Sequence, residues 1–486
     1  MRNRREGGAV AGAPPAAATA LGDGAGTVAA FVAGLRYEDL PAAVVAQAQR
    51  CLLDLAAAAI GGHATRLGRI VRDHVARHYG TASGARLMFD GRAAAPAWAA
   101  MANATMIDGF DSHDGHPLTK GHAGVAVLPG LLALAAGRRV TGQESLVALV
   151  LGYEIAIRAG IATHRTCSDY HTSGSWNALG VAAVAARLLG HDAETLRQAL
   201  GIAEYNGPRS QMMRCIDHPT MVKDGSGWGA LVGLEAALLA ADGFTGAPAL
   251  VVESAAAGDL WVDLGRRWRL LEQYFKPYPV CRWAHPAIEA TLTLRRTHGI
   301  DPAAVAGIEI ASFHEAIRLG AHHPRSTEEA QYSLGFTVAA ALARDGLGPA
   351  DIDNEALADP DILRLVDAIR LSERAEYNAR FPAERLADVV LVLADGRRLA
   401  SPPTPTRGDP GSPLSDAELE EKFRVLAGPA LGSARSSAIA EAIRALDRPD
   451  AELTPLLALL TDPVADQAER ASSQASSASR NGAKLL

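Results

Sequence analysis

The chain has 486 residues and a formal net charge of −7, and 48% of its residues are hydrophobic against 21% that are charged. These values are typical of a globular protein with two or three domains, and they exclude a disordered or fibrous chain. A mildly acidic protein is not expected to bind nucleic acid as its main partner, because neutralising phosphates requires a basic surface. No uninterrupted apolar run reaches the roughly 18 residues that a membrane span needs, so we expect no membrane partner.

Four cysteines are widely spaced along the chain, and no Cys-x-x-Cys pair occurs among them: Cys51, Cys167, Cys215 and Cys281. This pattern favours free thiols in a reducing cytoplasm over a disulfide framework or a zinc ribbon. We therefore expect a cytoplasmic protein.

Both ends of the chain have compositions typical of disorder. Residues 1–25 are rich in Gly, Ala and Pro, and residues 465–486 are rich in Ser, Ala and Gln. Neither segment can bury enough apolar surface to offset its chain entropy, so we expect a disordered leader and a disordered tail. A secretory signal is the alternative for the basic N-terminus, which lacks the Leu-rich stretch typical of such signals.

Helical patterns dominate residues 26–270. Residues 41–60 carry apolar side chains at helical spacing. Thr141 followed by Glu144 is the sequence of a capping box and predicts the start of a long apolar helix. Residues 225–241 combine small residues with leucines and predict a buried helix. These elements predict the first part of a helical domain.

The pattern changes near residue 270. Residues 307–313 alternate apolar and polar side chains, as a half-buried strand does. Residues 388–394 form a β-branched run, which is followed by Asp-Gly and then by residues 397–400. Asp-Gly between two such runs is a strong hairpin signal. We therefore predict an α+β lid domain over residues 271–403.

Residues 404–464 follow a Pro-rich linker and return to a helical pattern. Ser415 and Glu418 form a second capping-box sequence, and Asp192 in the first block is a further predicted N-cap. Because helical blocks stand before and after the strands, we predict a mainly α fold with an inserted α+β unit. The architecture is a large all-helical domain plus a smaller α+β lid domain.

Lysine is rare in this chain. Only five of its 47 basic residues are lysine, namely Lys120, Lys223, Lys276, Lys422 and Lys484. Lysine differs from arginine in being a compact charge with a tunable pKa. The first three lie in polar stretches with Gly or His, which indicates functional sites, and chance survival of surface lysines is the alternative. We expect Lys422 and Lys484 on the surface.

The densest polar segment is residues 108–122. It brings these side chains within a dozen residues: Asp111, His113, Asp114, His116, Lys120 and His122. Acids beside histidines can hold an imidazole in one tautomer and tune its pKa for acid–base chemistry. The same groups could instead bind a metal ion or form a solvated polar loop. Their spacing matches no usual metal signature, so we favour acid–base chemistry or carboxylate binding.

Three further segments combine polar side chains with turns or helix starts. Residues 168–174 precede a predicted helix, a position that suits an anionic ligand, although an ordinary N-cap beside a histidine is the alternative. Residues 221–229 contain three glycines, which let the backbone approach a ligand or another helix, without the pattern of a phosphate loop. Residues 275–286 lie at the predicted domain junction, where ligand clefts form, with a structural Pro-rich turn as the alternative.

Together these segments resemble the MmgE/PrpD family, which includes 2-methylcitrate dehydratase, cis-aconitate decarboxylase and iminodisuccinate epimerase. The resemblance covers about residues 27–463. It depends on the order and spacing of these stretches: 111–116 (DSHDGH), 122–129 (HAGVAVLP), 170–174 (YHTSG), 178–190 (ALGVAAVAARLLG), 223–229 (KDGSGWG), 276–286 (KPYPVCRWAHP) and 330–334 (AQYSL).

The resemblance implies a homodimer that acts on small di- and tricarboxylates without a metal or an organic cofactor. It places six residues at catalytic positions: Asp111, His122, His171, Lys223, Lys276 and Tyr332. In those positions the lysines would bind carboxylates and stabilise negative charge, the histidines would move protons, the aspartate would orient an imidazole, and the tyrosine would donate a hydrogen bond. Further substrate contacts are expected from His116, Lys120, Cys281, Arg282 and His285.

The sequence departs from the family pattern in three stretches. The common Asp-Asp-Thr-His of the family is replaced by residues 113–116 (HDGH), so the usual threonine hydroxyl is absent at Gly115. Thr172 stands where proline usually follows the histidine, and Cys281 occupies the position of a histidine in the decarboxylases, although many relatives carry a cysteine there too. We expect a lyase that dehydrates a small di- or tricarboxylate by removing a proton next to a carboxylate. The alternatives are epimerisation, cis-aconitate-type decarboxylation, or carboxylate binding without turnover.

Overall fold

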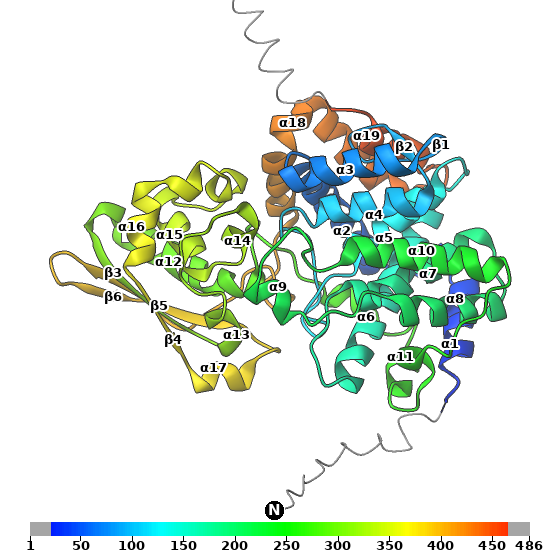
Figure 1. Cartoon of the computed structure of the whole chain (residues 1–486), viewed down its shortest axis with the longest axis horizontal. Helices are drawn as coiled ribbons and strands as arrows, with labels where there is room; N and C mark the ends of the chain where they lie inside the picture. Colours follow the sequence, from blue (N-terminus) through cyan, green and yellow to red (C-terminus); the bar gives the residue numbers. More distant parts are fainter. Residues whose placement is uncertain (1–20, 465–486) are drawn as a thin grey trace, which may run out of the picture.

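The computed structural model describes residues 21–464 and has two lobes of unequal size (Figure 1). The larger lobe is helical and contains the early part of the chain, coloured blue to green, together with the late part, coloured orange to red. The smaller lobe, mostly yellow-green to yellow, combines helices with a sheet. The predicted tail and residues 1–20 of the predicted leader lie outside the described residues, and the first helix, α1, begins at Gly24.

The larger lobe is built around one extensive hydrophobic cluster. Small residues let its helices approach closely, since a Cβ at Gly180 would lie 2.5 Å from the carbonyl oxygen of Gly152 in the neighbouring helix. Its elements are α1 (Gly24–Gly34), α2 (Ala42–His63), α3 (Arg66–Tyr79), β1 (Gly80–Arg86), β2 (Ala93–Ala94), α4 (Pro96–Ile107), α5 (Gly124–Ala135), α6 (Gly142–Thr166), α7 (Gly174–Leu189), α8 (Ala193–Asn206), α10 (Ser226–Ala241), α11 (Leu250–Glu253), α18 (Asp416–Arg444) and α19 (Thr454–Thr461). The short helix α9 (Met213–Asp217) lies between the lobes (Figure 1).

The helix caps that the sequence predicts are present. The Thr141 hydroxyl accepts a hydrogen bond from the backbone N–H of Glu144 at the start of α6. The predicted capping box is only half formed there, because the Glu144 carboxylate bonds Arg187. Asp192 caps α8 in the same way, and Ser415 and Glu418 form the reciprocal capping box of α18. Each cap satisfies backbone donors that a helix start otherwise leaves unpaired.

Two helices of the larger lobe, α2 and α6, are long and apolar enough to cross a membrane by length and composition alone. Their most apolar windows are 67% and 94% buried inside the protein. Burial of this kind is typical of the core helices of a globular domain.

The smaller lobe contains a five-stranded sheet of order β4-β3-β5-β6, in which β7 also pairs with β5. Strand β3 is parallel to β4 and antiparallel to β5, and β5 is antiparallel to β6. Val389, Leu391 and Leu393 alternate as buried residues along β5, and the predicted Asp-Gly turn joins β5 to β6. The elements of this lobe are α12 (His285–His298), β3 (Val305–Ser312), α13 (His314–Ile317), α14 (Thr327–Gln331), α15 (Leu334–Arg344), α16 (Pro360–Asp367), β4 (Ile369–Glu373), α17 (Ala375–Arg380), β5 (Leu386–Leu393), β6 (Arg398–Ala400) and β7 (Thr404–Pro405).

Each lobe has its own hydrophobic cluster, and the chain passes from one to the other within a few residues. Phe275 packs in the cluster of the larger lobe, whereas Tyr278 packs in that of the smaller lobe. After the sheet the chain returns to the first cluster at Leu414. The predicted mainly α fold with a smaller α+β domain is confirmed, while the domain limits at residues 270 and 403 and the homodimer stay predictions.

The prediction that Lys422 lies on the surface is wrong. Its side chain is 9% exposed, and its ammonium lies 2.5 Å from Oδ1 of the fully buried Asp54 in α2. The ammonium also donates to the backbone carbonyl of Ser112. Lys422 therefore anchors α18 both to α2 and to the polar segment that precedes α5. Lys484, the other lysine expected on the surface, lies outside the described residues.

We expect the Lys422→Met variant to lose about 3–5 kcal/mol of unfolding free energy, because it leaves the Asp54 carboxylate buried without its cation. Urea unfolding followed by circular dichroism measures the loss. The matched control is Arg444→Met, which breaks the exposed ion pair with Glu420 on the same helix and should cost less than about 1 kcal/mol. Adding Asp54→Asn to Lys422→Met should restore part of the stability, and equal stability of Lys422→Met and the wild type would contradict this account.

Candidate active site

A narrow cavity of about 30 Å³ lies where the two lobes meet. This volume is far below the roughly 300–1,000 Å³ of typical ligand pockets, so the two lobes enclose the cavity closely. Its lining residues come from segments far apart in the sequence: Asp111, Lys120, His122, Tyr170, Met212, Ile216, Asp224, Tyr274, Lys276, Cys281, Arg282, Trp283, Tyr332 and Arg385.

The imidazole of His122 has a defined orientation. Its Nδ1 lies 2.6 Å from the backbone carbonyl of Asp114, and because a carbonyl can only accept, Nδ1 carries the proton. Burial lowers the pKa of His122 well below its usual value, and the positive charges of His113 and Lys276 add to this effect. His122 is therefore neutral near pH 7, and its Nε2, 3.8 Å from Oδ1 of Asp111, has a free lone pair. A neutral imidazole with a free nitrogen can act as a general base.

Asp111 and Lys276 form a buried ion pair beside His122. Both side chains are less than one-tenth exposed, and the Lys276 ammonium contacts Oδ1 of Asp111 as well as its backbone carbonyl. Burial alone would raise the pKa of Asp111, but the Lys276 charge, helped by His122, holds it well below its usual range. Burial alone would lower the pKa of Lys276. The negative charge of Asp111 outweighs the effect of burial, so the pKa of the lysine is raised. The cavity thus holds a carboxylate and an ammonium in fixed positions.

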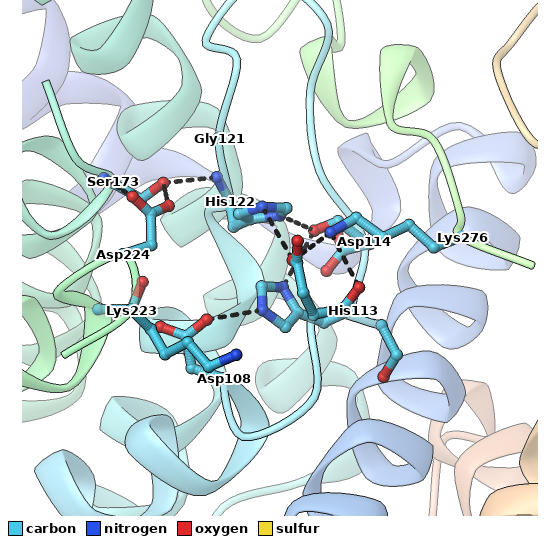
Figure 2. Close-up of polar contacts among 12 residues, drawn as sticks. Asp108, His113, Asp114, Gly121, His122, Ser173, Lys223, Asp224 and Lys276 are labelled. Carbon is cyan, nitrogen blue, oxygen red and sulfur yellow. Dashed lines mark hydrogen bonds and ion pairs between the residues drawn. The ribbon is translucent and has the colours of Figure 1, made fainter. Parts of the chain in front are cut away.

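Two polar networks hold His122 in place, one through its backbone N–H and one through the neighbouring ring of His113 (Figure 2). The backbone N–H of His122 donates to the Ser173 hydroxyl at 2.9 Å, and Ser173 in turn bonds both carboxylate oxygens of Asp224. Burial, followed by the charge of Asp108, raises the pKa of Asp224 well above its usual value. On the other side, Nε2 of His113 lies 3.1 Å from Asp108, and its ring packs edge-on against His122 with centroids 4.3 Å apart. His122 is therefore positioned from both sides.

Asp111, His113 and His122 offer ligand atoms that all lie within 4.8 Å of one another. This spacing would suit a metal ion. The Lys276 ammonium already bonds the Asp111 carboxylate, and its positive charge opposes a second cation at the same oxygen. The donor set therefore fits proton transfer better than metal binding.

Four groups in the cavity keep their protons at neutral pH. Burial raises the pKa of the phenols of Tyr170, Tyr274 and Tyr332 above the usual value. Burial also raises the pKa of the Cys281 thiol to about 12. The cavity therefore combines one neutral base with several protonated hydroxyl groups, which are hydrogen-bond donors.

Seven of the predicted site residues line this cavity, and four do not. The seven are Asp111, His122, Lys276, Tyr332, Lys120, Cys281 and Arg282. Lys223 lies next to it, because its ammonium is 5.2 Å from the centre of the Tyr332 ring. His171 is buried in the loop before α7, where Asp169 and Arg209 are its charged neighbours. The structure thus does not bring His171 to the cavity lining.

The predicted substrate contacts of His116 and His285 are not supported by the geometry, because both fully buried rings bond protein groups outside the cavity. His116 accepts from the backbone N–H of Leu118 at Nδ1, and its Nε2 lies 3.2 Å from the Glu272 carboxylate. Nε2 of His285 lies 3.1 Å from the Val280 carbonyl. His116 thus joins its loop to Glu272, His285 bonds the backbone of its own segment, and neither residue lines the cavity.

Sequence reasoning missed several residues that the structure places in or beside the cavity. Gln331 accepts from the backbone N–H of Asp111 and from the Lys223 ammonium, and so ties three motifs together. Gln331 lies in residues 330–334, one of the stretches that carry the family resemblance, and this was the sequence feature that could have identified it. Arg385 lines the cavity from the smaller lobe, and no motif in the sequence marked it.

Comparison with known proteins agrees with this arrangement. The MmgE/PrpD N-terminal domain matches residues 26–268, and the MmgE/PrpD C-terminal domain matches residues 278–448. This chain belongs to the MmgE/PrpD family. The predicted family membership is confirmed, and the gap between the two matched domains contains Lys276.

Three curated relatives of this MmgE/PrpD protein are named for the same reaction type. The cis-aconitate decarboxylase-like protein oryM of Aspergillus oryzae is 24% identical, over 89% of this chain and 96% of its own length. Cis-aconitate decarboxylase of Homo sapiens is 24% identical over 82% of this chain and 86% of its own length. The Mus musculus enzyme of that name is 22% identical over 92% of this chain and 96% of its own length. Decarboxylases are lyases, so the family and these relatives indicate a lyase-type protein.

We expect the ¹⁵N shifts of a histidine-labelled protein to show His122 neutral and protonated at Nδ1 from pH 8 down to pH 6. In Lys276→Met the pKa of His122 should rise, because a positive charge that disfavours the imidazolium is removed. Protonation then begins at a higher pH than in the wild type. The control Lys120→Met should leave this titration unchanged, and His122→Gln assigns the signal. An imidazolium at pH 6.5 in the wild type would contradict the assigned state.

Proposed function

We propose that this protein is a cofactor-independent lyase that dehydrates a small di- or tricarboxylate by removing a proton from the carbon next to a carboxylate. The observation that carries this proposal is the neutral His122 imidazole, whose free Nε2 lies beside the buried Asp111–Lys276 pair. Proton removal from such a carbon requires a base in that state and a cation that stabilises the resulting charge.

Proton removal uses three of these groups. Nε2 of His122 accepts the proton, while its Nδ1–H stays bonded to the Asp114 carbonyl. The electron pair left on carbon delocalises into the neighbouring carboxylate, where the Lys276 ammonium stabilises the added charge. Asp111 stabilises the imidazolium as it forms, because it is an opposite charge within 4 Å.

Dehydration also needs an acid for the departing hydroxyl, and Tyr332 is our candidate. It lines the same cavity, and burial raises the pKa of its phenol well above the usual value, so the proton is present at neutral pH. Transfer of that proton lets the hydroxyl leave as water while the carbon–carbon double bond forms. The Lys223 ammonium, 5.2 Å from the centre of the ring, stabilises the phenolate that remains.

Decarboxylation of cis-aconitate is the second candidate, because three relatives with that name align with at least 82% of this chain. Cys281 counts against decarboxylation, because the family resemblance places a histidine of the decarboxylases at this position. A thiol and an imidazole differ in shape and in proton-transfer chemistry, so Cys281 does not replace that histidine.

We expect the full chain, incubated in heavy water with a panel of di- and tricarboxylates, to convert one hydroxy acid into an ultraviolet-absorbing alkene. Deuterium from the solvent should enter the carbon next to the carboxylate when the reaction runs in reverse. NMR and mass spectrometry of the products measure both. Release of CO₂ from cis-aconitate would show that the protein is a decarboxylase and not a dehydratase. Recovery of deuterated substrate with inverted configuration would indicate an epimerase. Binding of a carboxylate without any turnover would show that the protein is not an enzyme for these compounds.

The His122→Gln variant should lose at least about a hundredfold in kcat, because removing a general base typically costs 10²–10⁴-fold. The matched control is His314→Gln, since His314 is an exposed histidine that pairs with Glu373 in the smaller lobe. The control should keep the wild-type rate. Equal rates in His122→Gln and the wild type would remove His122 from the mechanism.

A further inference from the structure

A second feature of the cavity is a guanidinium that has no acidic partner among residues 21–464. Arg385 is only 2% exposed and stands directly before β5 in the smaller lobe. Its Nη1 donates to the Pro382 carbonyl at 3.0 Å, and its Nη2 donates to the Pro117 carbonyl at 3.4 Å. Its Nε is buried and has no hydrogen-bond partner. A buried charge without a counter-ion is costly, so this arrangement points to an anion that completes it.

Lys120 supplies a second cation on the same cavity, from the larger lobe. Its ammonium lies 4.2 Å from the centre of the Tyr170 ring, and within the described part of the chain it forms no ion pair. Lys120 and Arg385 both line this cavity. Like charges in one cavity repel each other, and an anion bound between them would relieve that repulsion. Burial lowers the pKa of Lys120, Glu315 opposes this shift, and the positive charge of Arg385 adds to it, in agreement with that placement.

The other cations that line the cavity are already paired. Lys276 contacts Asp111, and Arg282 contacts Asp409. Arg385 lines the cavity together with Tyr274 and Cys281. The charges of Lys276 and Arg282 are therefore neutralised by carboxylates, whereas those of Lys120 and Arg385 leave an excess of positive charge in the cavity.

We propose that Lys120 and Arg385 form a subsite for one carboxylate of the substrate, separate from the point of proton removal. The positive charges that most lower the pKa of His122 are those of His113 and Lys276, not those of Lys120 and Arg385. A guanidinium with free donors can bind a carboxylate through two parallel hydrogen bonds. This inference rests on the proposed function and assigns places to two carboxylates of its substrate, one near Lys276 and one in the subsite.

The subsite also joins the lobes. Lys120 belongs to the segment before α5, whereas Arg385 precedes β5, and the bond from Arg385 to the Pro117 carbonyl already crosses the junction. A carboxylate held by both cations adds a further bridge between the two lobes. Substrates without that carboxylate would lose this bridge.

Calorimetric titration with tricarballylate, a tricarboxylate without a hydroxyl to eliminate, tests the subsite without turnover. We expect Arg385→Gln and Lys120→Met each to weaken its binding at least tenfold, and Arg385→Lys to weaken it less than Arg385→Gln does. The matched control is Arg364→Gln, because Arg364 in the same lobe also bonds only backbone carbonyls, those of Pro302 and Val305. It should bind tricarballylate like the wild type.

Two outcomes would overturn the subsite. One is wild-type affinity in both Lys120→Met and Arg385→Gln, and the other is no binding of tricarballylate by the wild type. Lys120 lies on a loop and is only partly buried, so its variant keeps the test informative if Arg385→Gln does not fold by circular dichroism.

Kinetics separate this inference from the proposed function. With a dicarboxylate that is turned over, the two variants should raise KM at least tenfold and change kcat little, whereas unchanged kinetics would reject the subsite and leave the lyase. If the wild type binds tricarballylate through Lys120 and Arg385 but turns over no member of the panel, the subsite stands and the proposed function fails.

Discussion

The buried ion pair between Asp111 and Lys276 is the interaction on which the arrangement of the site depends. Burying either charge alone would cost several kcal/mol, so each is tolerated only because the other is present. Lys276 lies between Phe275, in the core of the larger lobe, and Tyr278, in the core of the smaller lobe. The pair therefore lies where the chain passes from one core to the other, at the junction of the two lobes.

Burial keeps the His122 imidazole neutral, and the Asp111–Lys276 pair modulates this state. The Lys276 charge disfavours the imidazolium, and the Asp111 charge favours it, with burial as the largest effect. The Asp114 carbonyl and the Ser173 hydroxyl fix the ring and the backbone of His122, respectively. A base that is neutral at rest but lies within 4 Å of a carboxylate is stabilised as soon as it accepts a proton.

The sequence predicted well the features that depend on a few adjacent residues. The caps at Thr141 and Asp192 and the β5–β6 hairpin are confirmed, because each is determined by local hydrogen bonds or by turn geometry. Lys422 shows the opposite case. Its neighbours along the helix are glutamates, a pattern typical of a solvent-exposed helix face. The sequence could not reveal its buried partner, because Asp54 is 368 residues away. Arg385 was missed for the same reason, since its role depends on Pro117 in the other lobe.

Position 115 shows how a distant segment fills the space beside the site. A Cβ at Gly115 would lie 2.4 Å from the Tyr274 hydroxyl and 2.8 Å from Nδ1 of His122. The two segments are also joined by backbone hydrogen bonds between Gly115 and Tyr274. The phenol therefore fills the space that a side chain at position 115 would need, so glycine at 115 and tyrosine at 274 depend on each other. A protonated hydroxyl is thus kept beside the His122 base, although it comes from a residue 159 positions further along the chain.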